Sequence, residues 1–257
     1  MNIYLLSLLN HSIGDAMVRF SQLPVKSSLL SSNHLEKLAK LTKQILDSYM
    51  IFFKRVSIAS DDYHYNDQKI VKQFDFLTLE EKSLDELERK LLEIVSLKAE
   101  IQIIPVNIHL KEFEQLKLFS GFGILDGANH LITFYIYELT IAESSIKYTP
   151  NRLRYLDELL NSYQLSEEKS LRILASNFAI NYNQFQKDCK EYFGDTFYQF
   201  INKTKMLGAL VDQLFTNYSF KEIAARNGFS VYNNMHFLFR KKYRLPLELF
   251  PRLLSEI

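Results

Sequence analysis

Side chains that can hydrogen-bond to the edges of nucleic-acid bases gather in two stretches of the C-terminal half, at 182–187 and 232–237. An asparagine or glutamine amide can pair with adenine through two hydrogen bonds, and a lysine ammonium can donate to guanine. The candidate base-contacting residues are Tyr182, Asn183, Gln186, Lys187, Tyr232, Asn233, His236 and Phe237. Phe237 has no polar group, so we expect it to contact a thymine methyl group.

Basic residues accompany both stretches and could neutralise backbone phosphates. The candidates are Lys190, Lys203, Lys205, Arg240, Lys241 and Lys242. Phosphate contacts fix the register of a protein on a duplex and carry no sequence preference of their own. A basic triplet such as 240–242 is also common on solvated helix faces. It therefore indicates nucleic-acid binding only together with the elements that position it.

The net charge of the chain is only +1, but the charge is unevenly distributed. Residues 151–257 contain 15 Lys and Arg against 11 Asp and Glu, a net charge of +4. The first 150 residues contain 16 basic and 19 acidic residues, a net charge of −3. The difference has the sign expected if the C-terminal part approaches phosphates.

A start and a stop signal define a short helix in front of the second stretch. Ser219 and Glu222 have the S-x-x-E spacing of a capping box, which fixes the first turn of a helix. Gly228 is suited to the left-handed conformation that ends such a helix. Phe229 is expected to enter the core, and Ser230 is expected to cap a second helix. Two helices joined by a tight turn with a glycine form a helix-turn-helix motif.

The same pattern occurs about fifty residues earlier. At a spacing of 49 the related pairs are Leu174 and Ile223, Ala175 and Ala224, Ile180 and Phe229, and Asn181 and Ser230. At a spacing of 50 they are Phe185 and Met235, Cys189 and Phe239, Lys190 and Arg240, and Phe193 and Tyr243. The sequence therefore predicts two related motifs, at about 170–194 and 219–244, with one extra residue in the second turn.

Amphipathic periodicity predicts that the C-terminal part is helical nearly throughout. The expected helices cover 152–163, 170–178, 182–193, 197–215, 220–226, 231–243 and 248–254. A break in periodicity over 144–151 predicts a C-terminal domain of residues 149–257 and an N-terminal domain of residues 1–148. We expect a mainly α protein, with a C-terminal all-α domain of the double helix-turn-helix, homeodomain-like type.

The N-terminal part is predicted to be α+β. Helical spacing of apolar residues covers 33–54 and 84–97. Strand-like patterns cover 100–110, 122–125 and 131–139, and an Asp126-Gly127 turn could close a hairpin between the last two. Five aromatic residues there could line a pocket, although core packing is the commoner role: Phe119, Phe122, Phe134, Tyr135 and Tyr137.

Several function classes lack support in the sequence. Cys189 is the single cysteine, so an intramolecular disulfide and a multi-cysteine metal site are excluded. The six histidines have no metal-binding spacing, and no glycine-rich phosphate loop is present. Met1 to Asn10 lacks the features of a signal peptide, and no apolar run is long enough to span a bilayer. We therefore expect no enzyme activity, no cofactor and no metal, and a cytoplasmic protein.

Residues from about Ser166 to Phe250 resemble the C-terminal domain of the AraC/XylS family of bacterial transcription regulators. The second motif carries most of the resemblance, in Ile223-Ala224, Gly228-Phe229-Ser230, the run 239–243 and Pro246. The first motif contributes the following residues: Phe193, Gly194, Thr196, Phe197, Lys205 and Ala209. The match covers about a third of the chain.

The sequence departs from the family pattern at several positions. Ala179 and Arg244 stand where the family frequently has glycine, and Pro246 falls one residue early. Lys205 replaces the usual arginine of the linker helix, and Asp188 replaces an apolar or aromatic residue. The N-terminal part does not resemble the sugar-binding domain of the founding members.

The resemblance implies a sequence-specific transcription regulator that binds double-stranded DNA. The second helix of each motif would enter the major groove, at positions roughly 34 Å apart along the duplex. The N-terminal domain would sense a small-molecule effector or mediate homodimerisation. The alternative is a degenerate helix-turn-helix protein that docks a protein partner, as suggested by Asp188, Glu191, Val231 and Phe237 on the expected recognition faces.

Overall fold

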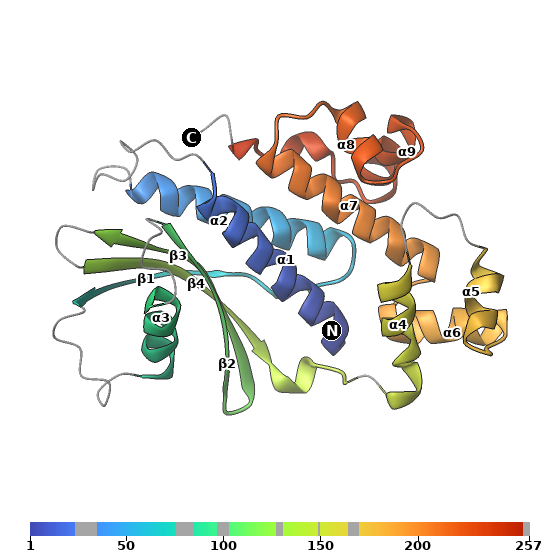
Figure 1. Ribbon diagram of the computed structural model, residues 1–257, viewed down its shortest axis with the longest axis horizontal. Helices are drawn as coiled ribbons and strands as arrows, with labels where there is room; N and C mark the ends of the chain where they lie inside the picture. The colour runs from blue at the N-terminus through green and yellow to red at the C-terminus, as the bar shows by residue number, and fades with distance from the viewer. Residues whose placement is uncertain are drawn as a thin grey trace. The chain divides into compact units, whose positions relative to one another are not determined.

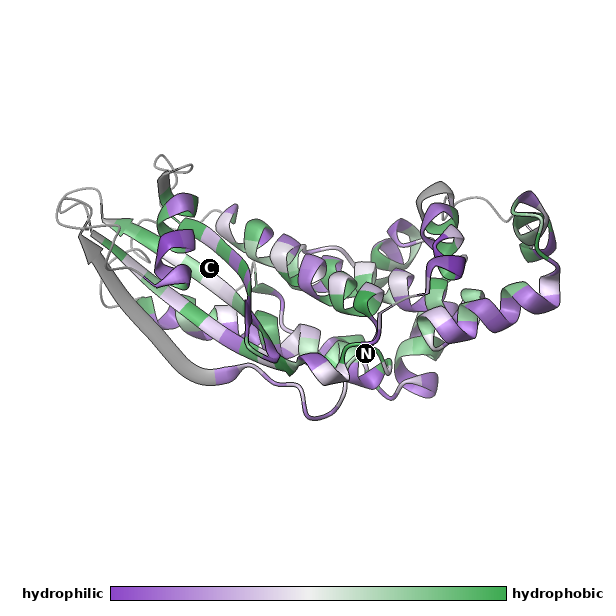
Figure 2. Ribbon diagram, turned by 90° about the horizontal axis from the view of Figure 1, so that it is seen from below, coloured by the Kyte–Doolittle hydropathy of each residue, from purple (hydrophilic) through white to green (hydrophobic). Residues whose placement is uncertain are grey.

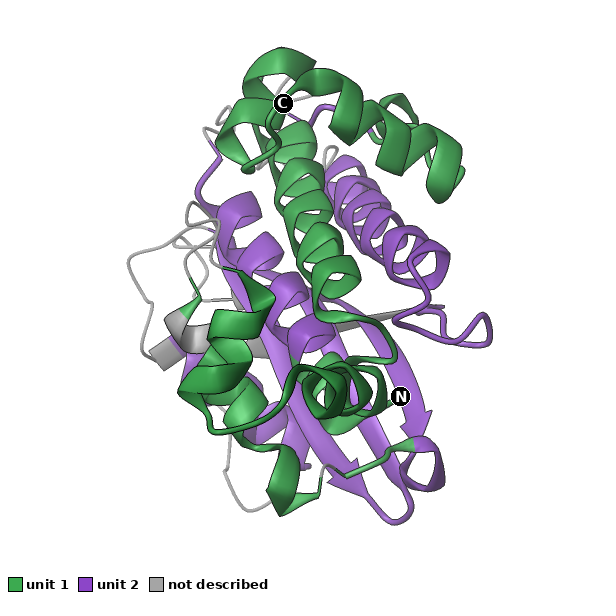
Figure 3. Cartoon of the chain, turned by 90° about the vertical axis from the view of Figure 1, so that its right-hand side faces the viewer, with its two compact units in different colours: residues 1–7, 146–250 green, residues 8–145, 251–257 purple. Residues whose placement is uncertain are grey.

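The computed structural model describes residues 1–23, 35–75, 85–96, 103–126, 131–148, 150–163 and 170–253. It divides into two compact units (Figure 3). The unit called here the helical unit comprises Met1–Ser7 and Ile146–Phe250, and the mixed unit comprises Leu8–Ser145 and Pro251–Ile257.

The mixed unit contains a four-stranded antiparallel sheet with strand order β1-β4-β3-β2 (Figure 1). The strands and helices of this unit are α1 (Ile3–Ser21), α2 (Leu35–Arg55), β1 (Asn66–Asp75), α3 (Glu86–Ser96), β2 (Ile103–Glu112), β3 (Gln115–Asp126), β4 (Leu131–Ala142) and the 3-10 turn η4 (Glu143–Ser145). The first residues of α1 belong to the helical unit. The predicted α+β class of the N-terminal part is confirmed.

Apolar side chains cover both faces of the sheet. Helix α3 packs Leu87 and Leu91 on one face, in a cluster with the even-numbered residues 104–110 of β2. On the other face Phe20 of α1 contacts Phe122, with 5.8 Å between ring centroids. From α2, the carbonyl of Ala39 accepts a hydrogen bond of 2.8 Å from the Tyr137 hydroxyl. Residues alternate in direction along a strand, so a strand covered on both faces needs apolar residues at consecutive positions, as in the buried run 103–106 of β2.

The five aromatic residues considered as a pocket lining are buried and do not converge on one site. Phe119 and Phe134 belong to the cluster under α3. Phe122 and Tyr135 stack on each other at 5.1 Å on the opposite face, where Tyr137 also lies. Core packing therefore accounts for these rings.

The sequence predicted most of these elements but not all. The expected helices over 33–54 and 84–97 are α2 and α3, and the three expected strands are β2, β3 and β4. Strand β3 begins seven residues earlier than expected, and α1 and β1 were not predicted. Strands β3 and β4 pair Asp126 with Leu131, while Gly127 lies outside the described residues.

The helical unit is built almost entirely of helices, as predicted. Its elements are η5 (Asn151–Leu153), α4 (Tyr155–Ser162), α5 (Leu171–Asn177), α6 (Tyr182–Phe193), α7 (Phe197–Phe215), α8 (Phe220–Arg226), α9 (Tyr232–His236), the π-helical segment η6 (Phe237–Lys242) and η7 (Leu247–Leu249). The helices carry bands of hydrophobic and hydrophilic residues (Figure 2). Aromatic rings fill the centre, where Phe193 stacks on Phe200 at 4.2 Å.

Candidate nucleic-acid interface

The second helix-turn-helix motif begins with the predicted capping box. The backbone N–H of Ser219 donates to Glu222 Oε2 at 2.7 Å, and the N–H of Glu222 donates to Ser219 Oγ at 3.4 Å. The hydrogen bonds from Ser219 favour the carboxylate and lower the pKa of Glu222. Helix α8 therefore has a fixed first turn, and Ile223 and Ala224 are buried one turn later.

The turn after α8 uses Gly228 in a left-handed conformation, with φ at 69°. The next residue, Phe229, is buried, and its N–H donates to the carbonyl of Ala224 at 3.0 Å. A glycine adopts this conformation without the strain that a Cβ atom introduces. The turn is tight because the chain reverses within these few residues.

The second helix of this motif is α9 followed directly by η6. The prediction that Ser230 caps it is wrong, because Val231 is the N-cap residue. Ser230 Oγ instead accepts a hydrogen bond of 2.7 Å from the Asn234 side chain. The extra residue of the second turn therefore lies directly after Phe229, and the structural counterpart of Asn181 is Val231.

The first motif repeats this geometry in α5 and α6. Asn181 caps α6 and accepts a hydrogen bond of 2.9 Å from the N–H of Gln184. Ile180 N–H donates to the carbonyl of Ala175 at 3.1 Å, the counterpart of the bond made by Phe229. Ala179 has a φ of 55° where the second motif has Gly228. The spacing of 49 seen in the sequence is therefore a true structural repeat.

Helix α7 joins the motifs and packs closely against α8. A Cβ atom at Gly208 would lie 2.1 Å from Asn227 Oδ1, so any other residue there would force the Asn227 side chain to shift. The Asn227 amide donates to Asp212 Oδ2 and to the carbonyl of Ile223, both at 2.8 Å. Asp212 also lies 3.5 Å from the guanidinium of Arg226. These bonds attach the second motif to the linker helix.

The candidate base-contacting residues lie at or near the surface of the two second helices. Asn183, Lys187, Asn233 and Phe237 are exposed, and Phe237 has 58% of its surface accessible. Tyr182 is also exposed. The half-buried candidates are Gln186, Tyr232 and His236. Their role as base contacts stays a prediction.

The candidate phosphate-contacting residues separate into exposed and buried groups. The exposed ones are Lys190, Arg240, Lys241 and Lys242. Lys205 is half-buried and donates to the carbonyl of Gly228 at 2.8 Å. The structure does not support Lys203 as a phosphate contact, because its side chain is buried and its ammonium pairs with Asp195.

Side chains from the elements before α5 pack against α6, and a single feature of the sequence pointed to these contacts. Asp188 is buried and accepts hydrogen bonds from Gln184, Tyr155 and Arg152, at 2.7, 2.9 and 3.3 Å respectively. The other guanidinium nitrogen of Arg152 lies 2.5 Å from the carboxylate of Glu191. Asp188 therefore faces the interior and not the recognition face, which removes it from the evidence for a protein-docking module. An unusual carboxylate at a core position was the only available signal.

The first residues of the chain also contact α6 and α7. The Tyr4 ring lies 5.3 Å from Tyr192 and 5.9 Å from Phe200, and the Asn2 side chain donates to the carbonyl of Tyr192. Burial and the nearby charge of Asp157 raise the pKa of Tyr4 to about 12. Residues nearly two hundred positions apart in the sequence thus share one core, which no local pattern could indicate.

In the part of the chain that the structure describes, no group of three or more histidine, cysteine, aspartate or glutamate side chains is arranged to hold a metal ion. No helix in the ranges described above combines the length and apolar character needed to cross a membrane.

Comparison with known proteins identifies a known domain in the part of the chain that contains these helices. Residues 174–250 match the family model described as a helix-turn-helix domain. No curated protein matches the chain. A solved structure with 20% identity is the C-terminal domain of the two-component response regulator yesN from Fusobacterium nucleatum, aligned over 39% of this chain and 98% of that one with a TM-score of 0.34. The matched range contains both second helices, α6 and α9 with η6, and the linker helix between them. Residues 174–250 are therefore a helix-turn-helix domain of the AraC type.

Proposed function

We propose that this chain is a sequence-specific, DNA-binding transcription regulator whose N-terminal part senses an effector or mediates dimerisation. The observation that supports it best is the structural repeat of the two motifs, each with polar or basic residues on the outer side of its second helix. In such motifs the second helix reads base edges in the major groove, while basic residues contact phosphates.

The two second helices would read different chemical groups. Asn183 and Lys187 are exposed on α6 and offer an amide and an ammonium to the bases. Asn233 on α9 offers a second amide, and the ring of Phe237 suits a thymine methyl group. A mixed site with adenine, guanine and thymine contacts is therefore the expected target.

The test is fluorescence anisotropy with duplexes from the region upstream of the chain's own gene, against scrambled duplexes of equal length. Specific binding should exceed scrambled binding by at least about 10³-fold and should weaken steeply between 50 and 200 mM salt. Asn183→Ala should cost about 1–3 kcal/mol of binding free energy and relax specificity at one base pair. Lys43→Gln, on α2, is a matched surface control. Equal affinity for both duplexes at every salt concentration would contradict the proposal.

A second candidate function, docking of a protein partner, draws on the exposed apolar residues of the second motif. Val231 and Phe237 have 53% and 58% of their surfaces accessible. Charge reversal by Lys241→Glu with Lys242→Glu should abolish DNA retention in a regulator. In a docking module that change should leave the level of DNA retention unaffected, whatever that level is, and Phe237→Ser should remove a co-purifying protein.

A further inference from the structure

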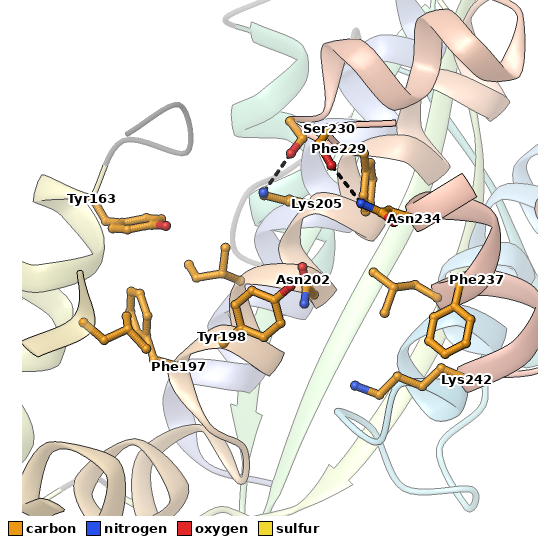
Figure 4. Close-up of a pocket in the computed structure, with 14 residues that line it drawn as sticks. Tyr163, Phe197, Tyr198, Asn202, Lys205, Phe229, Ser230, Asn234, Phe237 and Lys242 are labelled. Carbon is orange, nitrogen blue, oxygen red and sulfur yellow. Dashed lines mark hydrogen bonds between the residues drawn. The ribbon is translucent and has the colours of Figure 1, made fainter. Parts of the chain in front are cut away.

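A groove runs along the linker helix α7 beside the second motif (Figure 4). Its volume is about 460 Å³. In Figure 4 the side chains of Tyr198 and Lys205 from α7 lie across from Phe237 and Lys242 of η6. All fourteen lining residues belong to the helical unit.

The groove is lined by two lysines among aromatic, apolar and uncharged polar side chains. Lys205 and Lys242 are the charged residues among the fourteen that line it, and no carboxylate is found within that described set. Lys205 uses one of its three N–H donors on the carbonyl of Gly228. Lys242 is exposed, and its ammonium lies 5.1 Å from the centre of the Tyr243 ring. Both ammonium groups keep donors for a further acceptor.

The structural repeat shows how the flank of the second recognition helix that faces the groove differs from the matching flank of α6. In the second motif this flank is formed by Asn234, Leu238 and Lys242. Gln184, Asp188, Glu191 and Tyr192 lie on one flank of α6, and the elements before α5 cover that flank. The cover consists of Arg152, Tyr155 and Asp157, and Asp157 accepts a hydrogen bond of 2.5 Å from Tyr192. On α6, the carboxylates of Asp188 and Glu191 therefore pair with the guanidinium of Arg152, which precedes the first motif.

At a spacing of 50 the same flank of the second motif has the opposite charge. Leu238 replaces Asp188, and Lys241 replaces Glu191. Asn234 and Lys242 stand at the positions of Gln184 and Tyr192. The flank thus has the cations without the two carboxylates, which leaves it complementary to an anion from outside the chain.

We propose that a backbone phosphate of the bound DNA occupies this groove, held by Lys205 and Lys242 beside the Tyr198 and Phe237 rings. One side of the groove is formed by the second recognition helix, through Asn234, Phe237, Leu238 and Lys242, so a duplex read by that helix would bring its phosphates near the groove. The paired flank of the first motif takes no phosphate. The inference rests on the proposed function and adds a difference between the two motifs. On this flank of the recognition helix, only the second motif binds a phosphate.

The test compares the salt dependence of binding by the full chain and by Lys242→Gln. Loss of one phosphate contact should reduce the slope of log K against log salt by about 0.9, on specific and scrambled duplexes alike. Lys43→Gln should leave the slope unchanged. A Lys205→Arg variant should keep it, because a guanidinium still donates to both Gly228 and a phosphate.

A second measurement locates the phosphate. Duplexes with single neutral methylphosphonates should show one position at which the wild-type chain loses affinity and Lys242→Gln loses no more. An unchanged slope in Lys242→Gln, with wild-type binding intact, would overturn the groove proposal alone. Binding of inorganic phosphate to the groove in an NMR titration, together with that unchanged slope, would overturn it in favour of a small-anion site. Absence of any duplex binding by the wild-type chain would overturn the proposed function as well.

Discussion

Ala179 and Gly228 occupy the same position in the turns of the two helix-turn-helix motifs, and both have left-handed backbones with φ at 55° and 69°. The N–H of each also donates to the carbonyl three residues earlier, at 3.0 and 3.3 Å. Gly194 and Arg244, at a spacing of 50, also share a left-handed backbone, with φ at 74° and 52°. Each motif therefore has one glycine and one strained residue at its two left-handed positions.

Ala179→Gly should stabilise the helical unit by about 0.5–1 kcal/mol. Release of left-handed strain is worth roughly 1–2 kcal/mol, and the added freedom of the unfolded chain offsets roughly 0.4–1 kcal/mol of it. Thermal unfolding measures the change. Gly194→Ala is the reverse control, since no atom lies within 4 Å of the new Cβ and only backbone strain is added. A lower melting temperature in Ala179→Gly would contradict the expectation.

Asp188→Ala should destabilise the helical unit by about 1–3 kcal/mol, because it removes the acceptor of the Tyr155 hydroxyl and of the Gln184 amide. Asp188→Asn keeps one acceptor oxygen and should cost clearly less. Chemical denaturation of both variants measures the difference. Equal losses would show that the hydrogen bonds to Asp188 contribute little.

Gly208→Ala should weaken the attachment of the second motif, since the new Cβ would meet Asn227 Oδ1 at 2.1 Å. The overlap forces a shift that typically costs about 1–3 kcal/mol. Removal of the opposing amide in Gly208→Ala with Asn227→Ala should relieve the overlap. The double variant is then less destabilised than the sum of the single variants, and strict additivity would refute the close contact.

Acid should remove the contribution of the α8 cap. The pKa of Glu222 is lowered below its ordinary value of 4.5, chiefly by its hydrogen bonds with Ser219. A carboxylate with a lower pKa in the folded state stabilises above the unfolded pKa, and this contribution is lost as pH falls through the folded pKa. The melting-temperature difference between wild type and Glu222→Ala should therefore shrink below pH about 4.5. Glu222→Gln, which can also close a capping box, should show less of this pH dependence.

Cys189 should react slowly with thiol reagents in the folded protein. It is fully buried, and burial together with the nearby charge of Asp188 raises its pKa to about 12. At pH 8 the thiolate, which is the reactive form, is then scarce. Labelling with a chromogenic disulfide should become fast only in denaturant. Fast labelling of the native chain would show that α6 opens readily.

Local signals determined the motifs of the helical unit. The Ser219–Glu222 capping box and the buried Ile223 follow from spacing alone, because a helix start and its buried face depend on residues within one or two turns. The repeat of 49 and 50 residues could be recognised for the same reason. The β2–β3 hairpin could not be predicted in this way, because it turns at Phe113, a residue with φ at 51° that is not typical of turns.

Long-range contacts decided the rest. Lys203 looked like a surface cation on α7, yet its charge is paired with Asp195 in the core. Tyr4 joins a ring cluster with Tyr192, which stands 188 residues further along the chain. Periodicity shows that a residue is buried or charged, but the partner that satisfies it is chosen by which elements pack together. The sequence by itself therefore determined the two motifs, while only the tertiary structure decided which of their charged side chains are exposed and which are paired in the core.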